Sequence, residues 1–303
     1  MSFGAVAGEY DRLRPSPPPE AVDWLLPARR DVVVDLAAGT GLLTRALAGK
    51  VGHVIAVEPD ERMRSVLQAR SCDVEVLAGR GEAIPLPDAS ADAVFVSSAW
   101  HWMDPDLAVP EIARVLRDGG RFGVIWTGRN PHIEWLHADE WFAEALAERP
   151  ASGQDQSAGL PYPDPAEEVP AEEVPAEEVP AEKTLPERTL PERTLPEEIP
   201  TDEISVLERI PGGERRQVRL PDRTLFTNIE TELFRFSRYM PVTDIVDMLG
   251  TYSGVITASA ERRNIGRARA AAALAEQFPG AAELEMPMRS RCWRADRVSR
   301  TVR

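Results

Sequence analysis

Cysteine is scarce in this chain of 303 residues, which has only Cys72 and Cys292. The two stand far apart, without the short spacings of zinc ligands, and two cysteines do not make the disulfide framework of a small secreted domain. We therefore expect no metal site and a reducing, cytoplasmic setting.

Long apolar runs are absent as well. No stretch approaches the roughly 18 apolar residues needed to cross a bilayer. The first residues, MSFGAVAGEYDRLRP, lack the basic start and apolar core of a signal peptide. We expect an untargeted soluble protein without a membrane partner.

Positive charge is in deficit, since 35 Lys and Arg face 50 Asp and Glu, for a net charge of −15 at pH 7. Most of the excess lies in residues 151–203, which hold 15 acidic and three basic residues. The remainder is nearly neutral. Neither part offers the basic face that binds a polyphosphate backbone, so we expect no nucleic-acid partner.

Several catalytic motifs are missing too. The sequence has no Walker phosphate loop, no H-E-x-x-H metal helix and no G-x-S-x-G nucleophile elbow. It also lacks the Asn/Asp-Pro-Pro-aromatic motif of enzymes that modify amino groups of nucleic-acid bases. No catalytic pattern of these kinds therefore competes with the one described below.

What is present includes a low-complexity insert at residues 151–203. AEEVP occurs three times over residues 166–180 and TLPER twice over residues 184–193. Proline in every unit removes backbone donors, and one Val or Leu per unit buries too little surface to offset ordering, so the sequence predicts a disordered segment. It is either a docking segment for a basic or proline-recognising protein partner or a solvated expansion without function.

The remaining residues, 1–150 and 204–303, are expected to form one α/β domain interrupted by the insert. Short apolar runs alternate with helical patterns, which predicts a mostly parallel sheet. The expected strands are residues 32–37, 53–58, 74–79, 92–99, 121–127, 231–240 and 283–295.

Helical patterns fill the intervals, and one of them contains a proline. The pattern around residues 107–117 includes Pro110, which removes a backbone hydrogen bond, so we expect a kink or a late helix start there. The segment Asp118-Gly119-Gly120 is expected to end that helix. Residues 242–256 and 258–277 are also expected to be helical.

The sequence VVVDLAAGTG contains the strongest chemical signal. An apolar strand ends near Asp35, and Gly39-Thr40-Gly41 then leads into a helix. Glycines let a ligand approach the backbone, and the helix start offers unpaired N–H groups. A dinucleotide fingerprint would place a third glycine where Thr44 stands, which argues against NAD or FAD.

A carboxylate ends the second expected strand. Glu58 lies seventeen residues after Gly41, where a carboxylate at the carboxyl edge of a parallel sheet can accept both hydroxyls of a ribose. The third strand leads into a loop at residues 79–83 over the same edge. Its backbone is positioned to face an adenine.

These blocks resemble the class I S-adenosylmethionine-dependent methyltransferases. The resemblance rests on DLAAGTG, VEPDERM, GEAIPLPD and RVLRDGGRFGVIW, which occur in this order. The segments FGAVAGEYDRLRPSPPPEAVDWLL and SSAWHWMD are similar to the small-molecule, type 11 group that contains trans-aconitate methyltransferase.

The resemblance implies a Rossmann-like, doubly wound sheet of seven strands with a last antiparallel strand. It makes residues 1–150 the S-adenosylmethionine-binding core and residues 204–303 the substrate cap and last strands. The implied cofactor-binding residues are Tyr10, Asp35, Ala37, Gly39, Thr40, Gly41, Glu58, Pro59, Arg80, Gly81, Glu82, Ser97 and Ser98.

Arg80 departs from relatives that carry an acidic residue beside adenine. An arginine has no acceptor for the adenine amino group, so we expect the backbone of Gly81 and Glu82 to make this contact instead.

The resemblance places the exit of the fourth strand beside the reacting sulfonium. Trp100 is either an aromatic wall for the cation or a packing residue, and Trp102 is expected to be a packing residue. His101 is a candidate base for a hydroxyl acceptor, or is structural. The remaining candidates would bind the acceptor: Arg14, Arg129 and Arg238 by their charge, and Tyr252 by its position.

The sequence thus favours transfer of a methyl group from S-adenosylmethionine to oxygen of a small-molecule acceptor, a carboxylate or a hydroxyl. One alternative is a non-catalytic scaffold that binds the cofactor and recruits partners through the acidic repeat. A second alternative is an NAD-dependent oxidoreductase, which Thr44 and the lack of a hydride-transfer constellation disfavour.

Overall fold

The computed structural model describes most of the chain outside the repeat. The described residues are 7–71, 73–130, 133, 135–147, 218–222, 224–252, 255 and 258–299. The insert at residues 151–203, for which disorder is predicted, and Cys72 lie outside them.

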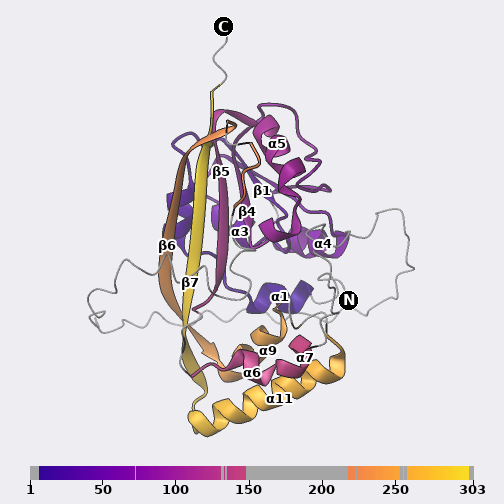
Figure 1. Ribbon diagram of the computed structural model, residues 1–303, viewed down its shortest axis with the longest axis vertical. Helices are drawn as coiled ribbons and strands as arrows, with labels where there is room; N and C mark the ends of the chain where they lie inside the picture. The colour runs from indigo at the N-terminus through magenta and orange to yellow at the C-terminus, as the bar shows by residue number, and fades with distance from the viewer. Residues whose placement is uncertain are drawn as a thin grey trace, which may run out of the picture. The chain divides into compact units, whose positions relative to one another are not determined.

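Seven strands form one sheet in the order β3-β2-β1-β4-β5-β7-β6 (Figure 1). Strands β1 to β5 run parallel, and β7 runs antiparallel to both of its neighbours, β5 and β6. The expected mostly parallel sheet with a last antiparallel strand is confirmed. The strands are β1 (Val32–Leu36), β2 (His53–Val57), β3 (Glu75–Leu77), β4 (Ala91–Ser97), β5 (Leu116–Arg129), β6 (Phe226–Pro241) and β7 (Glu283–Arg297).

Helices connect these strands and extend beyond them. They are α1 (Ala7–Leu13), α2 (Pro19–Leu25), α3 (Leu42–Leu47), α4 (Glu61–Arg70), α5 (Pro105–Val115), α6 (Ala138–Trp141), α7 (Ala143–Ala147), α9 (Val242–Gly250) and α11 (Ala260–Gln277). A short 3-10 helix, η2 (Trp100–Trp102), follows β4.

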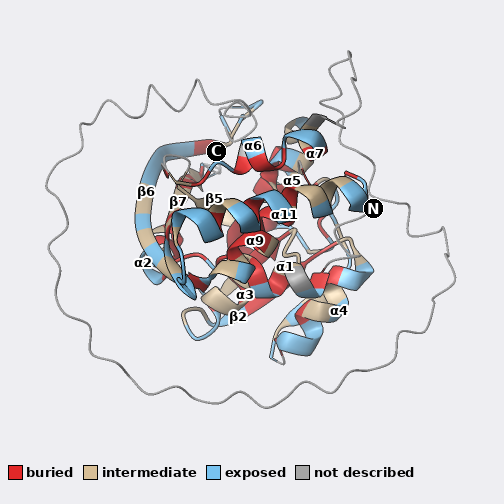
Figure 2. Cartoon of the chain, turned by 90° about the horizontal axis from the view of Figure 1, so that it is seen from below, coloured by how far each residue is buried: buried red, intermediate tan, exposed pale blue. Residues whose placement is uncertain are grey.

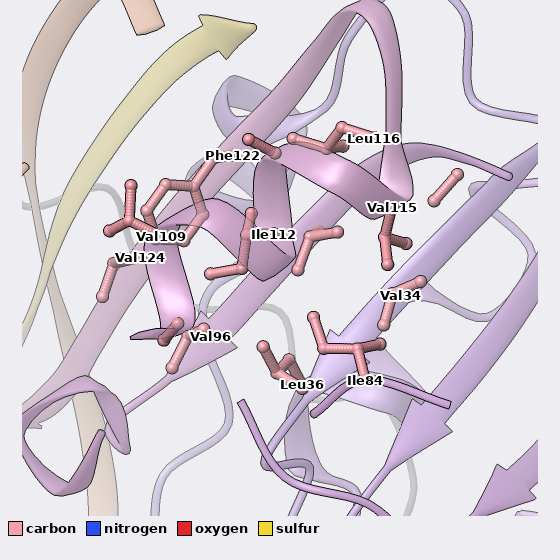
Figure 3. Close-up of a cluster of buried hydrophobic side chains, with 14 of the residues drawn as sticks. Val34, Leu36, Ile84, Val96, Val109, Ile112, Val115, Leu116, Phe122 and Val124 are labelled. Carbon is pink, nitrogen blue, oxygen red and sulfur yellow. The ribbon is translucent and has the colours of Figure 1, made fainter. Parts of the chain in front are cut away.

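The central strands β1 and β4 are buried on both faces, and each directs alternate side chains to opposite sides of the sheet. On one side, α5 packs against β1, β4 and β5 through residues such as Ile112, Val96 and Phe122 (Figure 3). On the other side, α2 and α3 pack through Leu25 and Leu43. Apolar sequence runs in β1 and β4 are therefore explained by cover on both faces.

A second apolar cluster lies beyond the carboxyl ends of the parallel strands. The ends of β6 and β7 contribute Met240, Met286 and Met288, which pack with α6, α7, α9 and α11. We call these four helices the cap. Figure 1 shows the cap below the sheet with α1 between the two, and in Figure 2 the side of α11 that faces away from the sheet carries exposed residues.

Two local expectations need correction. Helix α5 starts at Pro105 with an Asp104 cap and contains Pro110, so of the two expected outcomes the late start is wrong and the kink stays a prediction. The exposed Pro110 costs one backbone bond, which the buried face of α5 offsets. Residues 242–256 do not form one helix, since α9 ends at Gly250.

The segment Asp118-Gly119-Gly120 also has a different role from a simple helix stop. It lies within β5, where the pairing with β4 shifts register between Ala91 and Ala93. Gly119 has a φ of 73° there, a conformation that glycine adopts without strain.

Candidate functional site

The candidate site is built where β1 ends and the chain turns into α3. Three residues of this turn have positive φ angles: Ala37 at 56°, Gly39 at 58° and Gly41 at 88°. An added methyl at Gly41 would lie 2.9 Å from Leu67 Cγ, whereas at Gly39 it would meet nothing within 4 Å. The turn is therefore tightly packed toward α4 and open at Gly39.

Asp35 is fully buried in this turn. Thr44 Oγ1, on α3, donates a 2.6 Å hydrogen bond to Asp35 Oδ2, while Asp35 Oδ1 has no partner among the described residues. Burial raises the pKa of Asp35 from 3.8 to about 7 against the opposing effect of Thr44. A buried carboxylate oxygen without a donor is costly, and a cationic ligand would relieve that cost.

Glu58 follows β2 and is 3% exposed. Its Oε2 accepts from the Gly39 N–H at 2.8 Å and its Oε1 from the Asp60 N–H at 2.9 Å. Burial raises the pKa of Glu58 to about 7, although these two N–H groups lower it. Glu58 thus fixes the Gly39 turn, and each oxygen keeps a second lone pair for a ligand.

Other predicted residues near this edge are also held in place. Thr40 is 1% exposed, and its hydroxyl has no partner among the described residues. Arg64 donates to the Pro59 carbonyl at 2.6 Å and to the Glu58 carbonyl at 2.9 Å. The turn after β2 is consequently rigid before any ligand is bound.

The loop after β3 contacts the start of α5. Gly81 is buried, and a methyl there would lie 2.6 Å from Met103 Sδ. Glu82 Oε1 accepts from the Asp104 N–H at 2.9 Å. Arg80 is exposed and its carbonyl accepts from the Ala83 N–H. The predicted adenine contact by the backbone of Gly81 and Glu82 stays a prediction.

The exit of β4 lies beside that of β1, because Val96 pairs with Leu36. Ser97 ends β4, and Ser98 has a positive φ of 55°. Trp100 is 2% exposed, and its ring centroid lies 5.3 Å from that of Phe122 in the cluster under α5. This packing favours a core role for Trp100, and its role as a wall beside the cofactor stays a prediction.

His101 is exposed on η2, next to Trp102, whose ring centroid is 4.9 Å away. This exposure is compatible with proton exchange with an acceptor. The base role of His101 stays a prediction.

Helix α1 joins the β1 edge to the cap. Asp11, with a side chain 2% exposed, pairs with Arg45 of α3 at 2.5 Å and with Arg70 of α4 at 2.9 Å. The next residue, Arg12, pairs with Asp244 of α9 at 2.6 Å. Two adjacent residues of opposite charge therefore hold α1 to α3 and α4 on one side and to α9 on the other.

The substrate candidates are divided by the structure. The Arg14 guanidinium lies over the rings of Tyr252 and Tyr10, at 4.3 and 5.0 Å. Arg129 and Arg238 lie instead on the long strands, paired with Met288 and Met286 of β7. Arg14, Tyr10 and Tyr252 are thus brought together.

Sequence reasoning missed Thr44 and the partners of Asp11. Thr44 counted only as a departure from a glycine motif, although a hydroxyl one turn into α3 is placed to reach back to Asp35. The pairs of Asp11 join residues 34 and 59 positions apart along the chain, and no local pattern predicts such contacts.

Among the described residues, no helix combines the length and apolarity needed to cross a membrane. The same part of the chain holds no group of three or more His, Cys, Asp or Glu suited to a metal ion.

The sheet order and the turn between Asp35 and Glu58 define a class I S-adenosylmethionine-dependent methyltransferase fold. A family model described as a methyltransferase domain matches residues 34–124. This part of the chain is therefore similar to methyltransferase domains, whose cofactor is S-adenosylmethionine.

Individual proteins are similar to parts or all of the chain. An uncharacterised methyltransferase of Mycobacterium tuberculosis is 52% identical over 136 residues, covering 45% of this chain and 56% of the relative. One of Schizosaccharomyces pombe is 30% identical over 164 residues, covering 52% and 65%. The chain therefore spans little more than half the length of the curated relatives that it matches.

A solved structure shows the same fold over nearly the whole chain. It is that of a proposed type II methyltransferase from Anaeromyxobacter dehalogenans, with a TM-score of 0.58 and 22% identity. The match covers 95% of this chain and 99% of that one.

The chemistry of the residues at the β1 edge fits S-adenosylmethionine. Asp35 Oδ1 has no donor among the described residues, and an ammonium group would supply one. The space at Gly39 lets a ligand reach the backbone, and Glu58 offers two oxygens to adjacent hydroxyls. These features together fit the amino-acid and ribose portions of S-adenosylmethionine.

Proposed function

We propose that the protein transfers the methyl group of S-adenosylmethionine to an oxygen atom of a small-molecule acceptor. The observation that carries the cofactor half of this proposal is the orphaned Asp35 Oδ1 beside the open Gly39 turn. The oxygen acceptor is supported by Arg14, which can orient a carboxylate, and by exposed His101, which can accept a hydroxyl proton.

Asp35, Glu58 and the Gly39 turn act by binding and orientation. Asp35 would pair with the cofactor's ammonium, and Glu58 would accept from the ribose hydroxyls. When bound, the cofactor supplies a methyl group activated by a positively charged sulfur. The leaving thioether needs no proton, so alignment of the acceptor provides most of the acceleration that the protein must supply.

The role of His101 depends on the acceptor. A hydroxyl must lose a proton as it reacts, and a histidine near neutrality is suited to accept it. A carboxylate is already nucleophilic and needs only a cation to hold it. Activity on a hydroxyl should therefore depend on His101, and activity on a carboxylate should not.

Radiolabelled S-adenosylmethionine with separate panels of carboxylic acids, phenols and amines tests this proposal. Methyl esters or ethers should form. His101→Ala should slow methylation of a phenol by about tenfold or more, while the rate of ester formation should stay nearly unchanged. His137→Ala is a control, because His137 is an exposed histidine directly before α6 of the cap.

Two results would contradict the proposal. Transfer only to amines would show that the acceptor atom is wrong. Binding of the cofactor without transfer to any panel or cell extract would favour the scaffold alternative.

A further inference from the structure

Arg14 follows α1 and is enclosed by two aromatic side chains. Its guanidinium carbon lies 4.3 Å from the ring centroid of Tyr252 and 5.0 Å from that of Tyr10. Its Nη2 donates to the Thr251 carbonyl at 3.3 Å, just after α9. The charge is therefore partly buried between α1 and the residues that follow α9.

Two polar atoms of this stack lack partners. Arg14 Nε and Tyr252 Oη are both buried, and neither has a hydrogen-bond partner among the described residues. Both can donate a proton. Two unpaired donors on directly stacked side chains are the groups that an anion with two acceptor oxygens would satisfy.

Arg14 also lacks a carboxylate partner in the described parts of the chain. Its neighbours on α1 do have them, since Asp11 pairs with Arg45 and Arg70, and Arg12 with Asp244. Arg14 is partly buried, and a guanidinium that is shielded from water is costly unless an anion or hydrogen bonds compensate it. The pairs of Asp11 fix α1 against α3 and α4, whereas no carboxylate of the described residues pairs with Arg14.

We propose that Arg14 and Tyr252 form a carboxylate-binding site. A planar carboxylate matches the geometry of a guanidinium and receives two hydrogen bonds from it or from an adjacent hydroxyl. This inference rests on the proposed function. The carboxylate that binds is either the amino-acid carboxylate of the cofactor or a carboxylate of the methyl acceptor.

Three variants of the full chain isolate the site. Arg14→Gln removes the charge, and Tyr252→Phe removes only the hydroxyl while keeping the ring. Arg12→Gln is the matched control, because it removes an α1 arginine whose side chain is 50% exposed. Thermal unfolding of each variant verifies that it folds.

Calorimetric titrations with two cofactor-like probes test the first source. S-adenosylhomocysteine carries the amino-acid carboxylate, and 5′-methylthioadenosine lacks it. If the site holds the cofactor, Arg14→Gln should weaken the binding of S-adenosylhomocysteine by about tenfold or more, as expected for the loss of charge-assisted hydrogen bonds. The same variant should leave the affinity for 5′-methylthioadenosine unchanged. Tyr252→Phe should show the same selectivity to a smaller degree.

Phenylacetate and its neutral amide, phenylacetamide, test the second source. If the site holds the acceptor, S-adenosylhomocysteine-loaded protein should bind phenylacetate in preference to phenylacetamide. Arg14→Gln should remove that preference without changing affinity for either cofactor probe, and Arg12→Gln should retain it.

The proposal is overturned if Arg14→Gln and Tyr252→Phe match the native chain for all four probes, which would make the stack purely structural. Failure of the native chain to bind either cofactor probe would refute the proposed function instead. In that case, a preference of the ligand-free native chain for phenylacetate that Arg14→Gln removes would still support the site, and its absence would overturn it.

Discussion

At the residue scale, the candidate site contains two acidic side chains whose burial is energetically unfavourable when they are charged. Asp35 and Glu58 are both buried, and burial raises the pKa of each to about 7. Both carboxylates could be predicted from the sequence, because each follows an apolar strand. Thr44 could not be recognised as the donor to Asp35, because its function depends on how α3 packs over β1.

Asp35→Asn should stabilise the ligand-free protein at about pH 8. The folded protein raises the pKa of Asp35 above its ordinary value of 3.8, so it retains a proton that the unfolded chain loses. The free energy of unfolding therefore falls as pH rises from about 4 to about 7, by up to about 4 kcal/mol. Asparagine carries no such penalty, and urea unfolding at several pH values measures the difference.

Asp92→Asn supplies the opposite sign as a control. Burial acts to raise the pKa of Asp92, but the Val32 N–H and the Arg117 and Arg29 guanidinium groups lower it overall. Its charge is therefore stabilising above its ordinary pKa, and Asp92→Asn should lower stability at about pH 8. Equal destabilisation by both variants would contradict this account of Asp35.

At the element scale, the conformation of the β1–α3 turn can be distinguished from its role in binding by comparing two glycines. Gly39 and Gly119 both have positive φ, and a methyl on either would meet nothing within 4 Å. Only Gly39 lies at the carboxyl edge beside Glu58. The two glycines thus share a conformational requirement and differ in position.

Gly39→Ala and Gly119→Ala should lower stability by similar amounts, about 1–2 kcal/mol, because an L-residue is strained in the left-handed region. Only Gly39→Ala should also weaken the binding of S-adenosylhomocysteine, since its methyl group would lie in the space through which the ligand reaches the backbone. Chemical unfolding and calorimetry measure the two effects. Equal affinity in both variants would show that the ligand does not approach Gly39.

Helix α1 is a second element whose role depends on long-range pairs. Strand positions and α3 follow from local periodicity, whereas the contacts of α1 join charges far apart in the sequence. The same limitation applies to the end of α9 at Gly250, where the apolar pattern continues beyond the helix. Local sequence indicates which segments are amphipathic, and tertiary packing decides where each one ends.

Asp11→Asn should loosen α1. It removes a buried charge that pairs with Arg45 and Arg70, with an expected loss of about 1–3 kcal/mol. Hydrogen exchange should increase over Ala7–Leu13, whereas Arg12→Gln, which removes a half-exposed pair, should have a smaller effect. Unchanged protection in Asp11→Asn would contradict the proposed fastening.

At the scale of the whole molecule, segments on both sides of the repeat complete one sheet. Strand β5 precedes residues 151–203, and β6 and β7 follow them, yet β7 pairs with both β5 and β6. The sequence predicted this interruption from composition alone. It could not predict how far the long strands extend or that they carry the cap.

Deletion of residues 151–203 should leave the melting temperature and the affinity for S-adenosylhomocysteine nearly unchanged. The cost of closing a flexible loop depends only weakly on its length, and each doubling costs about 0.6 kcal/mol. Scanning calorimetry of the deletion variant measures this. A fall of many degrees would show that the repeat contributes to the stability of the domain.

The most direct test of the cofactor site is calorimetric titration with S-adenosylhomocysteine. The native chain should bind at about micromolar concentration, about −8 kcal/mol, and Glu58→Gln and Asp35→Asn should each weaken binding by about tenfold or more. Glu75→Gln, which changes an exposed carboxylate on β3, should bind like the native chain. Absence of binding by the native chain, or native affinity in Glu58→Gln and Asp35→Asn, would contradict the assignment of the site.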